Sequence, residues 1–109
     1  MTPSPLSKDL ATECRHSFLI DIFSTSTGAR INQIREALAV FNFSKIRAEA
    51  HTIKGVAREV GADAVAQACQ ELEIVSDLQD ILLVAARLKV VQERFEEIRS
   101  AMASYSTGL

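Results

Sequence analysis

The chain has 109 residues, of which 48% are hydrophobic and 24% charged, and its formal net charge is -2. This length fits one domain with a single core, and the few prolines, glycines and aromatic residues are typical of a helical protein. Because acidic and basic residues are mixed along the chain, the charge gives no indication of binding to nucleic acid or to an anionic membrane.

The cysteines and the first residues bear on the compartment. Cys14 and Cys69 lie far apart in apolar-periodic segments and form neither a disulfide framework nor a C-x-x-C site, so a reducing environment is expected. The opening MTPSPLSKDL lacks the features of a signal peptide, and no run reaches the roughly 18 consecutive apolar residues of a membrane span. The sequence predicts a cytoplasmic protein, expected to be a monomer, with no nucleic acid or membrane as partner.

The N-terminal third is predicted as a lead-in followed by a long helix. Residues 1–7 contain two prolines and are expected to be flexible, and the helical domain is predicted over residues 8–106. Residues 18–23 are apolar around most of the helix, which indicates a short extra N-terminal helical element that covers them. The stretch STSTG at 24–28 is weak for a helix, yet apolar spacings of three and four continue through it. One helix to about Phe41 is therefore favoured over a break at Gly28.

Three further helices follow from periodicity and from caps. Ser44 is predicted as the N-cap of a helix that ends at Val60, and Gly61 ends it in a left-handed conformation. The next helix spans Ala62 to about Ser76, and Asp80 is predicted to cap the last one. Their apolar stripes are Ile46, Ala50, Ile53, Ala57 and Val60, then Val65, Ala68, Cys69, Leu72 and Val75 or Ser76, then Ile81, Val84, Leu88, Val91, Phe95, Ile98, Met102 and Tyr105. Together they predict an all-α, antiparallel up-down four-helix bundle.

His51 stands out on the second of these helices. At 100° per residue it points well away from the buried stripe, so its imidazole is expected in solvent. The neighbours of His51 one turn away on the outer face of this helix are Ala48 and Gly55, which have the two smallest side chains. We call Ala48, His51 and Gly55 the outer strip. A glycine inside a helix lowers stability, and room for another protein's backbone is a physical reason for it.

Cations line one flank of this histidine, namely Arg47, Lys54 and Arg58. A neutral imidazole nitrogen is a competent nucleophile near neutral pH, and phosphoryl transfer needs positioning and charge stabilisation more than further covalent chemistry. The strip shows no second catalytic group. It therefore indicates a carrier of phosphoryl groups and not a self-sufficient enzyme.

At these residues the chain resembles the histidine-containing phosphotransfer (HPt) domain family of two-component phosphorelays. The resemblance lies in the run from His51 to Gly55, in Gly61-Ala62 and in Leu72-Glu73, and more loosely in residues 34–38 before the histidine helix. It implies that His51 accepts a phosphoryl group from a receiver-domain aspartate and passes it to another. The implied partners are response-regulator receiver domains and a hybrid histidine kinase.

The resemblance also implies roles for the neighbours of the histidine. Lys54 would stabilise the phosphoryl group, and Gly55 would admit the receiver, with Ala48, Arg47 and Arg58 in the docking surface. No cofactor or metal is expected on this chain, and a divalent metal is expected on the receiver. Many members have small or amide residues where this chain has Arg58-Glu59, which bears on which receiver fits.

Other readings of the sequence stay open or are disfavoured. An interaction-only bundle that docks a receiver or kinase without accepting phosphate is the alternative. A metal or cofactor bundle is disfavoured because His16 and His51 lack the Glu-x-x-His pairs of such cores, and an autonomous kinase because no Gly-rich nucleotide loop is present. His16 is assigned no role, and Glu71 and Glu73 are expected to be solvated or to pair helices. The chain fits a free-standing carrier and an excised domain of a hybrid kinase equally.

Overall fold

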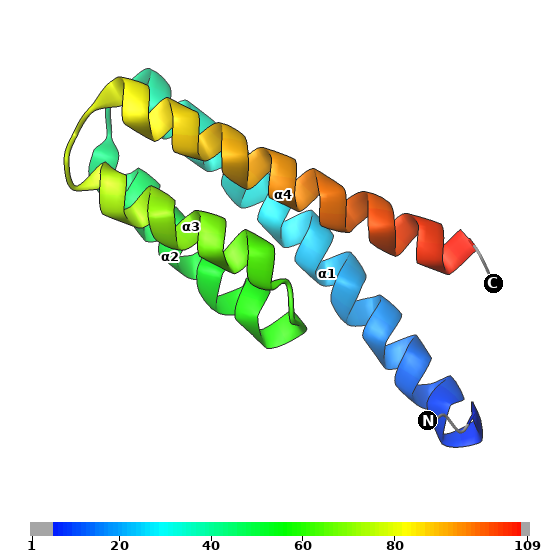
Figure 1. Ribbon diagram of the computed structural model, residues 1–109. Helices are drawn as coiled ribbons and strands as arrows, with labels where there is room; N and C mark the ends of the chain where they lie inside the picture. The colour runs from blue at the N-terminus through cyan, green and yellow to red at the C-terminus, as the bar shows by residue number, and fades with distance from the viewer. Residues whose placement is uncertain (1–5, 108–109) are drawn as a thin grey trace.

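The computed structural model describes the backbone of residues 6–107 and the side chains of residues 21–101. This part of the chain contains four helices and no strand: α1 (Leu6–Ala39), α2 (Phe43–Val60), α3 (Asp63–Ser76) and α4 (Ile81–Thr107). They alternate in direction (Figure 1), which confirms the predicted antiparallel four-helix bundle. The side chains of Cys14, His16, Met102 and Tyr105 lie outside the described part.

Helix α1 is one continuous element. It begins at Leu6, directly after Pro5 and two residues before the expected start at Lys8, because a proline is tolerated next to a helix start but not inside. The N-terminal helical element expected as a separate piece is continuous with α1, and residues 1–5 of the lead-in lie outside the described residues. The helix also passes through Gly28 without a break. Phe23, Thr27 and Ile31 are buried on either side, so tertiary packing outweighs the weak local propensity.

The turn between α1 and α2 corrects one predicted cap. Phe41 adopts a left-handed conformation with φ 57°, which ends α1 at Ala39. The next residue, Asn42, is the N-cap of α2, and its side chain accepts a hydrogen bond of 3.2 Å from the Lys45 N–H. The prediction of Ser44 as the cap was wrong, because the helix begins at Phe43 and Asn42 already satisfies the N–H three positions on.

The end of α2 and the start of α4 confirm the other two signals, Gly61 and Asp80. Gly61 has φ 81°, its N–H donates to the Arg58 carbonyl, and the Ala62 N–H donates to the Ala57 carbonyl at 2.8 Å. This is the Schellman arrangement that favours glycine. At the start of α4, the Asp80 carboxylate accepts hydrogen bonds from the N–H groups of Leu82 and Leu83.

The four helices surround one apolar core. The backbones of α1 and α2, α2 and α3, α3 and α4, and α1 and α4 approach one another, whereas within the described residues no Cα atoms of the diagonal pairs lie within 8 Å. The buried apolar residues are Phe23, Ile31, Ile34, Ala37, Ile46, Ala50, Ile53, Ala57, Ala62, Val65, Ala66, Ala68, Cys69, Leu72, Val84, Leu88, Val91 and Phe95. Val60, Val75 and Ile98 pack partly buried against them. Because each fully buried large aliphatic or aromatic side chain contributes about 1.5–3 kcal/mol, this core holds α2 and α3 rigidly.

The two central helices are shorter than α1 and α4 and cover only the part of them near the α1–α2 and α3–α4 connections (Figure 1). Phe23 and Phe95 meet edge to face, with ring centroids 6.0 Å apart, and tie α1 to α4. The outer faces of α2 and α3 therefore lie side by side as one surface of the bundle, and this surface carries the candidate site.

Candidate functional site

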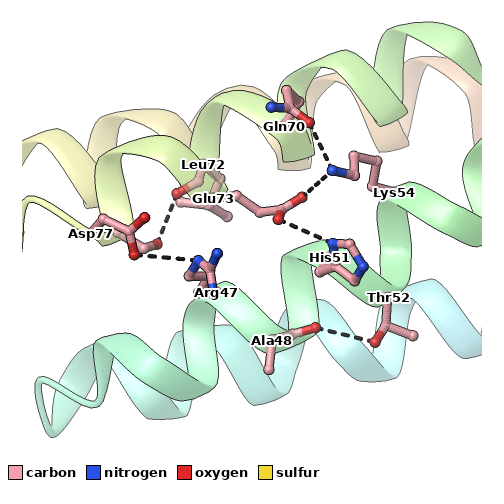
Figure 2. A network of polar contacts seen from close by, with 10 residues as sticks. Arg47, Ala48, His51, Thr52, Lys54, Gln70, Leu72, Glu73 and Asp77 are labelled. Carbon is pink, nitrogen blue, oxygen red and sulfur yellow. Dashed lines mark hydrogen bonds and ion pairs between the residues drawn. The ribbon is translucent and has the colours of Figure 1, made fainter.

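Four polar contacts cross the seam between α2 and α3 (Figure 2), and one of them joins Lys54 Nζ to Glu73 Oε2 at 2.7 Å. Arg47 Nε lies 3.3 Å from Asp77 Oδ1, His51 Nδ1 lies 3.1 Å from Glu73 Oε1, and Lys54 Nζ donates to Gln70 Oε1 at 2.7 Å. Positions 47, 51 and 54 on one helix thus meet 77, 73 and 70 on the other. Each step forward along α2 is matched by an equal step back along α3, as antiparallel packing requires. The seam is therefore a row of polar side chains that pair between α2 and α3 above the core.

His51 is exposed as the sequence predicts. Its side chain keeps 69% of its surface in solvent, while Nδ1 is turned toward the carboxylate of Glu73. A carboxylate accepts hydrogen bonds, so this contact selects the tautomer with the proton on Nδ1. Nε2 then carries the lone pair. The imidazole is held from one side and presents a nucleophilic nitrogen on the other.

Glu73 is the centre of the arrangement, and the sequence reasoning missed it. Its side chain is only 11% exposed, with Oε1 on His51 and Oε2 2.7 Å from Lys54 Nζ. Burial by itself raises the pKa of the Glu73 carboxyl, but the contacts with Lys54 and His51 outweigh burial and lower the pKa below its ordinary value. Glu73 is therefore ionised at neutral pH. The expectation that it pairs helices holds, and the alternative expectation that it is solvated is wrong.

Lys54 is largely buried in the seam between α2 and α3. Its side chain is 12% exposed, and its ammonium lies between Gln70 Oε1 and Glu73 Oε2, both at 2.7 Å (Figure 2). The helical direction of Lys54, toward one flank of His51, is as predicted. Because its charge is paired with Glu73, Lys54 reaches His51 through that carboxylate.

The two small residues of the outer strip lie where the sequence predicts them. Ala48 and Gly55 are exposed on either side of His51, and a Cβ added at Gly55 would meet no atom within 4 Å. No neighbouring helix thus requires a glycine at this position. Open space above Gly55 leaves the approach to the imidazole unobstructed.

The two arginines lie at the edge of this surface and not at the imidazole. Arg47 is exposed and paired with Asp77. Arg58 is exposed, and no ion pair among the described side chains involves it. The structure brings His51, Glu73 and Lys54 together and leaves Arg47 and Arg58 outside that cluster.

Other groups near the cluster offer no competing chemistry. Cys69 is buried behind it, where burial and the Glu73 charge raise the pKa of its thiol to about 12, so it stays protonated as a small apolar residue. Within the described residues, no three histidine, cysteine or acidic side chains are grouped to hold a metal ion. No helix in residues 6–107 is long and apolar enough to cross a membrane.

An all-α antiparallel bundle that exposes a histidine from its second helix defines the class of this protein. The family model of the Hpt domain matches residues 19–105, and the chain therefore belongs to the Hpt domain family. Its members are phosphocarriers of two-component phosphorelays that interact with receiver domains and kinases. No curated protein and no solved structure gives a significant match.

Proposed function

We propose that His51 is the phosphoryl acceptor of this chain and that it exchanges the group with receiver-domain aspartates. The observation that carries the proposal is the 3.1 Å contact of Nδ1 with a buried carboxylate on an otherwise exposed imidazole. It leaves Nε2 free to attack. Family membership supports the reaction class, and the contact at Nδ1 supports Nε2 as the attacking nitrogen.

In the proposed step, the Nε2 lone pair attacks the phosphorus of an aspartyl phosphate on the receiver. The P–N bond forms, the P–O bond to the aspartate breaks, and its electron pair returns to the carboxylate. The proton on Nδ1 stays in place, so the ring becomes positively charged, and the adjacent Glu73 carboxylate balances this charge. The reverse sequence passes the group to a second receiver. The divalent metal that such transfer requires is proposed on the receiver.

The direct test starts from a receiver domain charged with acetyl phosphate and mixed with this chain. We expect a phosphate on the chain that is labile in acid and stable in alkali, as a phosphoramidate bond is, and peptide mass spectrometry should place it on His51. Demonstrated docking to the receiver without any such label would favour an interaction-only bundle.

Glu73 is proposed as the residue that sets the imidazole tautomer. Replacing Glu73 with glutamine should slow transfer about 10- to 100-fold, as loss of a partner that orients a functional histidine typically does. The variant Glu71→Gln is the matched control, because Glu71 is the acidic residue two positions away and pairs with Arg87 on α4. Single-turnover transfer and the ¹⁵N chemical shifts of the His51 ring measure the effect. Equal rates for the two variants would remove Glu73 from the mechanism.

Lys54 is proposed to act mainly by holding Glu73 ionised and in place. Replacing Lys54 with alanine should slow transfer about tenfold, or about 1.4 kcal/mol in activation free energy, without abolishing it, because the nucleophile remains. Lys45→Ala is the control, since Lys45 binds Gln33 on the opposite flank of α2. If Lys54 acts through Glu73, the double variant Lys54→Ala/Glu73→Gln should transfer the phosphoryl group only slightly more slowly than Glu73→Gln alone. Full additivity in single-turnover transfer would instead favour direct contact of Lys54 with the phosphoryl group.

A further inference from the structure

Large apolar side chains are concentrated at one end of the bundle. The α1–α2 and α3–α4 connections both lie at this end, next to the first turn of α4 (Figure 1). Among the described side chains, seven large apolar ones are exposed, and five of these belong to this end. We call these five the apolar end, and they are Val40, Phe41, Leu78, Leu82 and Leu83. Exposed apolar side chains that are scattered singly need no explanation, whereas a group of them indicates a contact surface.

Phe41 is unfavourable at its position in an isolated chain. It ends α1 in the Schellman arrangement that Gly61 forms at the end of α2. The Phe41 N–H donates to the Leu38 carbonyl at 3.1 Å, and the N–H of the next residue donates to the Ala37 carbonyl at 2.8 Å. This place requires a left-handed backbone, with φ 57°, which strains any residue that has a Cβ. Phe41 also keeps 63% of its surface in solvent, so a contact outside the chain would explain why a phenylalanine stands here.

Charge at this end is low and is already paired within the chain. Residues 39–45 and 77–86 contain only three charged residues, which are Lys45, Asp77 and Asp80. Their partners are, in the same order, Gln33, Arg47 and the first N–H groups of α4. These two segments therefore offer an incoming protein no free charge for an ion pair. In a two-fold dimer the same surface meets itself, and an apolar surface is its own complement, so a second copy of the chain needs no opposite charge.

The area of this end suits a weak dimer. Across its long axis the structure measures 20 × 17 Å. A helix with its side chains is about 10–12 Å wide, so four helices packed two by two present an end of roughly 500 Å². Two such ends bury about 1,000 Å² together, which is the lower limit for a specific interface, and interfaces below about 1,200 Å² are weak and transient.

We infer that the apolar end is the contact between two copies of this chain, which form a weak two-fold dimer end to end. Phe41 is the aromatic anchor of this contact, and the leucines at the start of α4 surround it. Because the area is small, we expect a dissociation constant on the order of 10–100 μM. Such a dimer differs from the monomer that the sequence predicts. The inference is independent of the proposed function, because His51 points to the side of the bundle and not to its end.

The variant Phe41→Gly tests the dimer without endangering the fold. It removes the ring and at the same time relieves the strained backbone, because glycine is the residue that this turn favours. We expect the dimer to become at least about tenfold weaker, while the monomer melts at the wild-type temperature or above. Sedimentation equilibrium of the full chain from about 1 μM to about 1 mM measures the dissociation constant, and thermal melting of the dilute chain measures stability.

Two controls separate the ring from the strain and from apolar exposure in general. Gln79→Gly relaxes the other left-handed residue of this end, with φ 54°, without removing an apolar side chain. Ile22→Gln removes an exposed apolar side chain that lies about 27 Å along α1 from Val40. Both variants should dimerise within about twofold of the wild type. The double variant Leu82→Gln/Leu83→Gln should instead weaken the dimer as Phe41→Gly does.

The possible results decide between a second copy and other occupants. A chain that stays monomeric up to about 1 mM would overturn the inference, and cosedimentation of that monomer with phosphatidylcholine vesicles would assign the apolar end to a lipid surface. A dimer that forms equally well in Phe41→Gly would show that the contact lies elsewhere. Phosphoramidate, a small phosphodonor that needs no protein docking, should label His51 equally in all these proteins. Absence of that label would contradict the proposed function and leave the dimer standing.

Discussion

Replacing His51 with glutamine should abolish phosphorylation of this chain while leaving the bundle folded. The imidazole supplies the only proposed nucleophile, and a glutamine amide cannot form the P–N bond. Because the His51 side chain is 69% exposed, its loss should change the free energy of unfolding by less than about 1 kcal/mol. Acid-labile label and thermal melting measure the two expectations separately.

The chain carries its own control for this substitution. It contains two histidines, and His16→Gln changes the other one, whose position belongs to α1, and leaves the sequence of α2 intact. That variant should take up label like the wild type from a charged receiver and from phosphoramidate. Label that survives in His51→Gln, or disappears in His16→Gln, would show that the acceptor has been assigned to the wrong residue.

The orientation of His51 follows from the sequence because it depends on one helix alone. Ile46, Ala50 and Ile53 repeat at the helical period and are all buried, so any residue well off their direction must face out. The same holds for Gly61, since a left-handed helix end is a local property of the backbone. Local rules therefore predict where the imidazole points and where its helix ends.

The environment of Lys54 and Glu73 depends instead on how two helices align. Along α3 alone, Glu73 is one more acidic residue at the edge of the apolar stripe, and nothing there specifies what faces it. The contact with His51 exists because the Gly61 turn fixes the antiparallel register of α2 against α3. The sequence does contain one indication of this alignment of α2 and α3. Polar residues at 47, 51 and 54 and at 70, 73 and 77 follow the same spacing in opposite order around that turn.

The N-cap of α2 could not be predicted from the sequence for a different reason. Asn42 and Ser44 both have side chains that cap helices, and their preferences differ little. The structure favours Asn42 because the left-handed Phe41 turns the chain directly before it, so the cap lies two residues earlier than predicted. A bulky residue with positive φ is uncommon, so the sequence gives little reason to expect the turn there. This shift of two residues leaves the direction of His51 unchanged, because the apolar stripe fixes it.

Substituting Gly55 with leucine should make the chain more stable and the transfer slower. Leucine is a better helix former than glycine by roughly 0.8 kcal/mol, and no atom lies within 4 Å of the added Cβ. The side chain would project beside His51 into the space that a receiver backbone has to enter. A displacement of about 1 Å between reacting groups can cost about 100-fold in rate, and we expect a loss of that size in kcat/KM.

Gly28→Leu provides the matched control, because Gly28 is also a helical glycine with no atom within 4 Å of an added Cβ. It lies on α1 among the residues that line a groove against α4, which includes Phe95 and Arg99 and none of the α2–α3 seam. Both leucine variants should melt at higher temperature, but only Gly55→Leu should lose transfer from a charged receiver. Labelling by phosphoramidate should stay near the wild-type rate in both. Normal transfer in Gly55→Leu would mean that the receiver approaches His51 from a direction that leaves Gly55 uncovered.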